Sequence, residues 1–123
     1  MDVVFDLARR SNAWDGVKPL IAAALERNPR SVAHLNYRSF VLESEGDLPQ
    51  AERVLREALD VEPDDSATRS NLGRVLLRQG RYAEAVDHLQ RAAELSPSSV
   101  SARRALAEAR RLAGLDAPAG GDD

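Results

Sequence analysis

The stretch SATRSNLGRVLLRQGRYAEAVDHLQRAAELSPSS, residues 66–99, sets the pattern that the rest of the chain follows. When the sequence is compared with itself at an offset of 34 residues, small, apolar and helix-breaking residues of this stretch meet residues of the same type. The pairs are Gly80 with Gly46, Ala85 with Ala51, Leu89 with Leu55, Ala92 with Ala58, Leu95 with Val61 and Pro97 with Pro63. So many matches at one offset indicate an internal repeat.

The same offset finds further copies of the repeat on both sides. One more step back places Ile21, Ala24 and Pro29 in register, with Asn12 at the turn position that glycine holds in the later copies. Asparagine is the non-glycine residue that best tolerates a left-handed turn. One step forward places Leu106 in register with Leu72. We therefore expect repeats over about residues 1–31, 32–65 and 66–99, followed by one further helix.

Within each copy, apolar residues at spacings of three and four predict two helices on either side of a turn. Proline in the first turn of a helix, as at Pro19 and Pro49, is compatible with helix formation, because the first N–H groups have no partner within the helix. We expect Asp15, Ser31 and the serine-rich stretch of residues 98–101 to cap helices. The predicted helices cover residues 2–10, about 16–27, 31–44, 48–60, 67–79, 83–94 and about 100–113.

Small residues recur where two helices of a copy would cross. Ala51, Ala58, Ala85 and Ala92 leave room for the facing backbone, and Gly73 is expected to do so on the first helix of its copy. These positions should therefore be buried at close helix contacts.

The set Asn71-Leu72-Gly73, Gly80, Tyr82, Ala85, Ala92 and Pro97 resembles the tetratricopeptide repeat, a helix-turn-helix unit that stacks into a solenoid. The resemblance implies an all-α, right-handed α-solenoid of seven helices, in which three repeats are followed by a C-terminal capping helix at about residues 100–113. It implies one domain over residues 1–115. The tail, residues 116–123, has the sequence DAPAGGDD and is expected to be disordered.

Composition restricts the class of function. The chain has 123 residues, 43% of them hydrophobic and 30% charged, with a formal net charge of −3. No basic tract indicates nucleic-acid binding, and no apolar run is long enough to span a bilayer. The absence of cysteine excludes disulfides and thiolate metal sites. Because the N-terminus lacks the basic and apolar regions of a signal peptide, we expect a cytoplasmic protein that contacts neither membrane nor nucleic acid.

In the family that the chain resembles, ligands bind mostly on a concave wall lined by the first helix of each repeat. The residues at those positions are Asp2, Asp6 and Arg9 in the first copy, Asn36, Phe40 and Glu43 in the second, Ser70, Arg74, Leu77 and Arg78 in the third, and Arg104, Glu108 and Arg111 on the last helix. Acids predominate near the N-terminal end and arginines near the other end. We therefore expect a non-enzymatic adaptor that binds a protein or peptide, with an acidic segment or a C-terminal carboxylate held by arginines.

Some members of this family bind the C-terminal tail of a chaperone through lysines, arginine and asparagines on successive first helices. Asn71 stands at one such position, and Asn36 is chemically close at another. The lysines are missing, so a chaperone tail is not the favoured ligand.

No motif indicates an enzyme, a cofactor or a metal site. His34 and His88 lie in different repeats, and neither is followed at three or four residues by a second histidine or by paired carboxylates. Phosphate-binding loops and nucleophile motifs are absent from the sequence.

Two alternatives to a free-standing adaptor stay open. In the first alternative, the chain is a self-assembling scaffold, in which Val3, Val4 and Phe5 of its short first helix dock on another copy of the same chain. It is an accessory region if it belongs to a larger enzyme or to a secretion or assembly machine. The sequence leaves open the partner, the pathway, the oligomeric state and whether the chain is a fragment.

Overall fold

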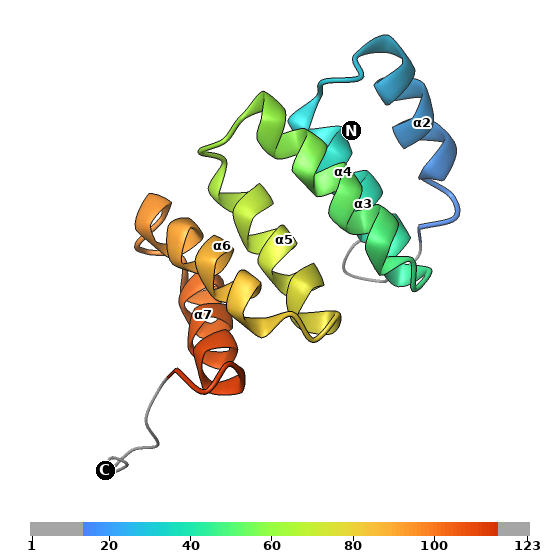
Figure 1. The fold of residues 1–123 in the computed structure, drawn as a ribbon. Helices are drawn as coiled ribbons and strands as arrows, with labels where there is room; N and C mark the ends of the chain where they lie inside the picture. The colour runs from blue at the N-terminus through green and yellow to red at the C-terminus, as the bar shows by residue number, and fades with distance from the viewer. Residues whose placement is uncertain (1–13, 116–123) are drawn as a thin grey trace. The chain divides into compact units, whose positions relative to one another are not determined.

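The computed structural model describes residues 14–115, and every regular element in that range is a helix (Figure 1). The helices are α2 (Lys18–Arg27), α3 (Val32–Ser44), α4 (Leu48–Val61), α5 (Ser66–Arg78), α6 (Tyr82–Leu95) and α7 (Val100–Leu112). The chain divides after Pro63 into two compact parts, which we call unit 1 and unit 2. The division falls in the turn between the second and third predicted repeats.

The predicted helix boundaries are confirmed to within about two residues for these six helices. The predicted first helix, residues 2–10, lies outside the described residues, and so does the tail, residues 116–123. Among the helices described, none is long and apolar enough to cross a lipid bilayer.

In unit 1, α3 packs along α4, and α2 packs on α3. Trp14, Ile21 and Val41 form a buried cluster that joins the start of the described chain to α2 and α3. A second cluster joins Leu35 of α3 to Val54 and Ala58 of α4. The core of unit 1 is therefore built from residues at helical spacing, as the sequence predicts.

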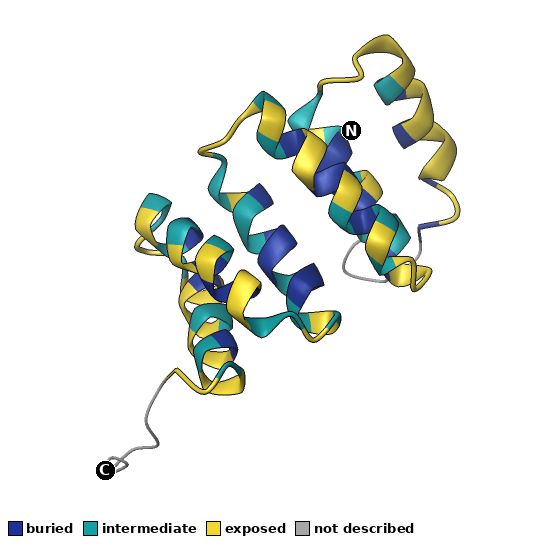
Figure 2. Ribbon diagram, in the orientation of Figure 1, coloured by how far each residue is buried: buried dark blue, intermediate teal, exposed yellow. Residues whose placement is uncertain are grey.

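In unit 2, α5 and α6 form an antiparallel pair, and α7 packs on α6 and also contacts α5. Figure 2 shows buried residues along α5, α6 and α7, with exposed residues between them. Gly73 is buried where α5 crosses α6, and a Cβ atom placed on it would lie 2.4 Å from Cγ of Leu89. The predicted small residues Ala51, Ala58, Ala85 and Ala92 are all fully buried.

The turns follow from local sequence. Gly46 and Gly80 have φ angles of 82° and 77°, in the left-handed region that glycine adopts without steric cost. Ser31 and Ser99 accept hydrogen bonds from backbone N–H groups three residues ahead, which confirms both predicted caps.

The predicted cap at Asp15 is wrong. The helix begins at Lys18, and the residue before it, Val17, makes no side-chain cap. A backbone turn takes the place of the cap, since the carbonyl oxygen of Trp14 accepts hydrogen bonds from the N–H groups of Val17 and Lys18, each at 3.0 Å. Burial of Trp14 and Val17 holds this turn in place.

Candidate functional site

On α3, the candidate residues Asn36, Phe40 and Glu43 are spaced by four and three residues, so they share one face of the helix. Asn36 is buried, and its amide nitrogen donates to the carbonyl oxygen of Val32 at 2.9 Å. Phe40 is half-buried and stacks on Trp14, with ring centroids 6.0 Å apart and planes at 4°. Glu43 is also buried. Part of this face therefore serves the fold of unit 1.

On α5, Ser70, Arg74 and Leu77 also share one face, and all three are half-buried. The guanidinium of Arg74 donates to the side-chain oxygen of Asn71 at 3.2 Å. Asn71 thus orients Arg74, a role that the sequence analysis missed although the spacing of three residues would have allowed it. Arg78, at the end of the helix, is exposed.

On α7, Arg104, Glu108 and Arg111 are exposed and again share one face. Arg111 donates two hydrogen bonds to the carboxylate of Glu108, at 3.3 and 2.5 Å, so its charge is already paired. The side chain of Arg104 makes no hydrogen bond or ion pair within residues 14–115. Arg104 is therefore available to an anionic ligand, whereas Arg111 would have to leave Glu108.

These residues define what we call the basic surface of unit 2, which comprises Arg74, Arg78, Arg104 and Arg111 on the contacting helices α5 and α7. Arg91 of α6 does not belong to it, because its guanidinium donates to the carboxylate of Asp64 at 3.0 Å. That hydrogen bond raises the pKa of Arg91. Guanidinium groups on neighbouring helices are suited to bidentate contacts with carboxylates.

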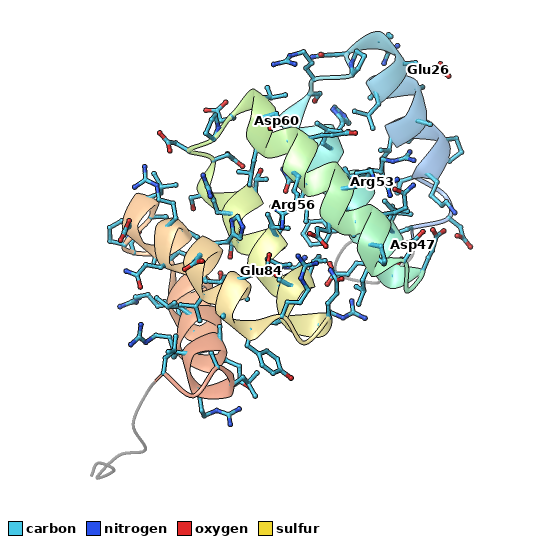
Figure 3. All side chains as sticks on the ribbon, viewed as in Figure 1. Glu26, Asp47, Arg53, Arg56, Asp60 and Glu84 are labelled. Carbon is cyan, nitrogen blue, oxygen red and sulfur yellow. The ribbon has the colours of Figure 1, made fainter. Side chains whose placement is uncertain are left out.

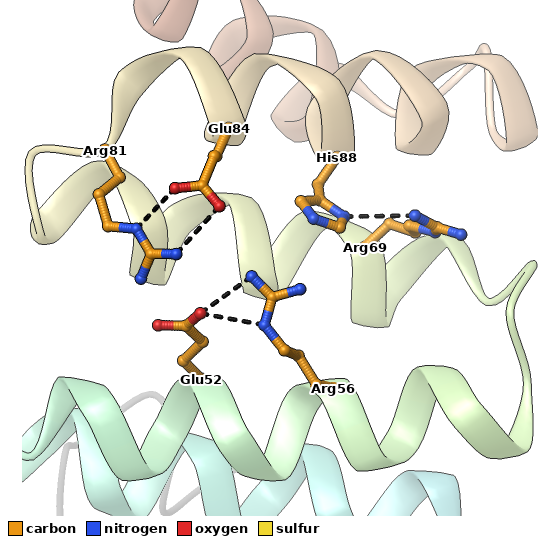
Figure 4. Close-up of polar contacts among 6 residues, drawn as sticks. All are labelled: Glu52, Arg56, Arg69, Arg81, Glu84 and His88. Atoms are coloured by element: carbon orange, nitrogen blue, oxygen red, sulfur yellow. Dashed lines mark hydrogen bonds and ion pairs between the residues drawn. The ribbon is translucent and has the colours of Figure 1, made fainter.

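Many other charged side chains in the described residues form ion pairs within one helix or lie on solvent-exposed helix faces. Figure 3 shows Asp47 at the N-terminal cap of α4, and Arg53, Arg56 and Asp60 along the helix. In the close-up of Figure 4, Arg56 pairs with Glu52 within α4, with 2.9 Å between Nη2 and Oε2. The side chain of Arg56 is 44% exposed and that of Glu52 is 14% exposed, so solvent screens this pair only in part.

The two histidines have structural partners. His34 lies 2.8 Å from the hydroxyl of Ser31 and meets the ring of Tyr37 edge-on. Nδ1 of His88 lies 3.2 Å from a guanidinium nitrogen of Arg69 (Figure 4). Because arginine only donates, this contact requires an unprotonated Nδ1 on His88. Among residues 14–115, no three acidic, histidine or cysteine side chains are grouped to hold a metal ion.

The sequence matches one protein-family model and two curated proteins. The family model described as "Tetratricopeptide repeat" matches residues 41–100. Cell division cycle protein 27 homolog A of Arabidopsis thaliana is 34% identical over 76 residues, which are 62% of this chain and 11% of that protein. Small glutamine-rich tetratricopeptide repeat-containing protein 2 of Mycosarcoma maydis is 30% identical over 87 residues, which are 71% of this chain and 25% of that protein. The chain thus spans a quarter or less of the length of these curated relatives.

Solved structures share the fold at low sequence identity. The Sgt2 domain from Aspergillus fumigatus matches with a TM-score of 0.81 at 20% identity, over 91% of this chain and 76% of that one. The first such domain of Spaghetti (RPAP3), solved with the HSP90 peptide SRMEEVD, matches with a TM-score of 0.80 at 14% identity, over 89% of this chain and 87% of that one. The match to the family model, together with the repeat of 34 residues and the helix-turn-helix units, shows that the chain belongs to the tetratricopeptide repeat family.

Proposed function

We propose that this chain binds an extended peptide or protein segment of acidic character, and that the basic surface of unit 2 holds its carboxylates. Tetratricopeptide repeat domains are protein-interaction modules. The observation that carries the proposal is the pair Arg74 and Arg104. Arg74 is oriented by Asn71, and Arg104 has no side-chain partner among the described residues.

In the same proposal the repeats form a right-handed solenoid, and α7 caps it. The packing of α7 on α6 supports this role, as do the exposed arginines on its outer side. Ser70 and Leu77 share a face of α5 with Arg74 and complete the proposed site in unit 2, where the half-buried Leu77 would offer apolar contact to the bound segment. In unit 1, Asn36, Phe40 and Glu43 stay candidate binding residues on their own face of α3.

A structural neighbour supports a peptide ligand, since the Spaghetti domain was solved with the peptide SRMEEVD, which has three acidic residues. The present chain lacks the lysines expected for such a tail. We therefore propose recognition of acidic charge rather than of that particular sequence.

The experiment measures binding of fluorescein-labelled SRMEEVD and of a scrambled peptide of the same composition by fluorescence anisotropy. We expect both peptides to bind the wild-type chain with affinities within about twofold, and more weakly as salt is added. The double variant Arg74→Glu/Arg104→Glu should weaken both by about tenfold or more, because two charge-assisted contacts become repulsive.

The matched control is Arg27→Glu/Arg30→Glu, which makes the same change of net charge at exposed residues of unit 1. It should leave both affinities within about twofold of wild type, since it spares the basic surface. Equal losses in the two double variants would mean that net charge alone attracts the peptide. Unchanged binding in the Arg74→Glu/Arg104→Glu variant would overturn the proposal.

The proposed role is non-enzymatic and cytoplasmic. Because the chain spans 11% and 25% of two curated relatives, a role as the accessory region of a larger protein is the second candidate. Self-assembly through Val3, Val4 and Phe5 concerns residues outside the described range and stays a prediction. Light scattering at several concentrations tests it, and a monomer throughout would exclude it.

A further inference from the structure

Arg38 of α3 breaks the repeat at a position that is otherwise apolar. The residue 34 positions later is Leu72, which is fully buried, and the residue another 34 positions on is Leu106, which is half-buried. Arg38 is exposed instead. An arginine cannot enter the core here without leaving its charge unpaired, so the space that a leucine would fill is left partly open.

Two clefts of unit 1 meet at Arg38. The first, of about 370 Å³, lies between α2 and α3, and the second, of about 380 Å³, lies among the end of α2, α3 and α4. Both are lined in part by apolar side chains. These are Ile21, Val41 and Leu42 in the first cleft and Leu25, Leu35 and Val54 in the second.

The other cations that line the clefts have partners. Lys18 forms an ion pair with Glu45 at one end of the first cleft. Arg53 donates to the side-chain oxygen of Gln50 at 2.5 Å beside the second. The side chain of Arg38 makes no hydrogen bond or ion pair within residues 14–115. Among residues 14–115, Arg38 is thus a guanidinium without a partner, and it lies between two clefts that are lined in part by apolar side chains.

This region lies away from the proposed peptide groove. Successive residues of a helix are rotated by about 100°. Arg38 therefore points about 200° away from Asn36 and from Phe40, on the other side of α3. Binding at the clefts would leave the groove face of α3 untouched.

We propose that the two clefts form a second interaction surface, which binds a partner segment with one acidic side chain between two apolar ones. Each apolar side chain enters a cleft, and the carboxylate accepts hydrogen bonds from Arg38. The lining charges are Lys18, Arg38 and Arg53 against Glu45 and Glu57, a balance of +1 that favours an anionic segment.

The probe is the capped peptide Ac-AALAEALAA-NH2, with Ac-AALAQALAA-NH2 as its neutral counterpart. In an extended peptide, alternate residues point to one side, so both leucines and the central residue can face the clefts. We expect wild-type protein to bind the glutamate peptide about tenfold more tightly than the glutamine peptide, as one charge-assisted hydrogen bond implies. Amide chemical-shift changes should map to α2 and α3.

The decisive variant is Arg38→Leu, which installs the residue that the repeat carries at Leu72 and should therefore fold. It should bind both peptides weakly and with equal affinity, because the leucine removes the cation and partly fills the clefts. The control Arg30→Leu removes the same charge from an exposed residue of unit 1 that lines neither cleft, and it should keep the preference for glutamate. Equal binding of the two peptides by the wild-type chain would overturn the proposal, and so would a preference for glutamate that survives Arg38→Leu. The Arg74→Glu/Arg104→Glu variant keeps both clefts, so this test is independent of the proposed function.

Discussion

Replacing Gly73 by alanine tests the close contact between α5 and α6. Alanine is the better helix former, and on propensity alone the substitution should stabilise the chain by about 1 kcal/mol. The structure predicts the opposite sign, because the new Cβ atom would lie 2.4 Å from Cγ and 2.6 Å from Cδ2 of Leu89. Carbon atoms in van der Waals contact lie about 3.5–4.0 Å apart.

The magnitude follows from what Leu89 can do. Leu89 is fully buried, and its atom nearest to the new Cβ is Cγ, the branch point of the side chain, rather than a flexible end. The distance between the two carbons falls about 1 Å short of van der Waals contact, so α5 and α6 must separate by a large part of that difference. Overpacking of this kind costs about 1–3 kcal/mol, and we take the upper half of that range because Leu89 has no exposed direction to move in. After the gain in propensity is subtracted, Gly73→Ala should destabilise by about 1–2 kcal/mol.

The assay is urea denaturation followed by far-UV circular dichroism, with Gly16→Ala as the control. A Cβ atom on Gly16 would meet no atom within 4 Å, so that variant should differ from wild type by no more than about 0.5 kcal/mol. A double-mutant cycle with Leu89→Ala should show that the two substitutions together cost less than the sum of their separate costs. Wild-type or higher stability of Gly73→Ala would refute the packing argument.

Three further predictions concern caps, an ion pair and a cleft. Asp65→Ala should lower the free energy of unfolding by about 1 kcal/mol in urea denaturation, because the carboxylate of Asp65 caps α5 by accepting from the N–H of Thr68 at 3.0 Å. Ser31→Ala should cost less, because the hydroxyl of Ser31 accepts from the N–H of His34 at the longer distance of 3.4 Å. Equal losses in the two variants would contradict this order. The hydrogen bond to Glu45 raises the pKa of Lys18 above its usual 10.5, so the stabilising contribution is present below that pH and is lost as the pH rises through the raised pKa. The small stability difference between wild type and Lys18→Met should vanish at the alkaline end, and a difference that grows there would contradict the assignment. Arg38→Leu should raise the midpoint of thermal unfolding, with a gain of about 0.5–2 kcal/mol from partial filling of the clefts, and a lower midpoint would show that Arg38 supports the fold.

The repeat and its helices could be predicted because their signals are local. Gly46, Gly80, Pro63 and Pro97 end or separate helices through backbone restrictions that act within a few residues, whatever the rest of the chain does. The alanines that recur at the offset of 34 residues were also predicted to be buried at helix contacts, and Ala85 is fully buried.

Features that depend on contacts between helices were harder to predict. The sequence could not show that Asn36 and Glu43 are buried, because their spacing fits an exposed face equally well. The pairing of Glu108 with Arg111 was foreseeable from their spacing of three residues, and it leaves Arg104 as the more available cation. Arg38 could not be predicted as a site, because one arginine at an apolar position of the repeat is equally compatible with an ordinary exposed helix face.

The proposed function requires that the basic surface of unit 2 hold an acidic segment. The most direct test is to titrate the isotope-labelled chain with the peptide SRMEEVD and to monitor the amide chemical shifts by NMR. We predict saturable changes on α5 and α7 around Arg74 and Arg104, and their loss in the Arg74→Glu/Arg104→Glu variant. Changes confined to other helices, or changes on α5 and α7 that persist in the double variant, would contradict the claim.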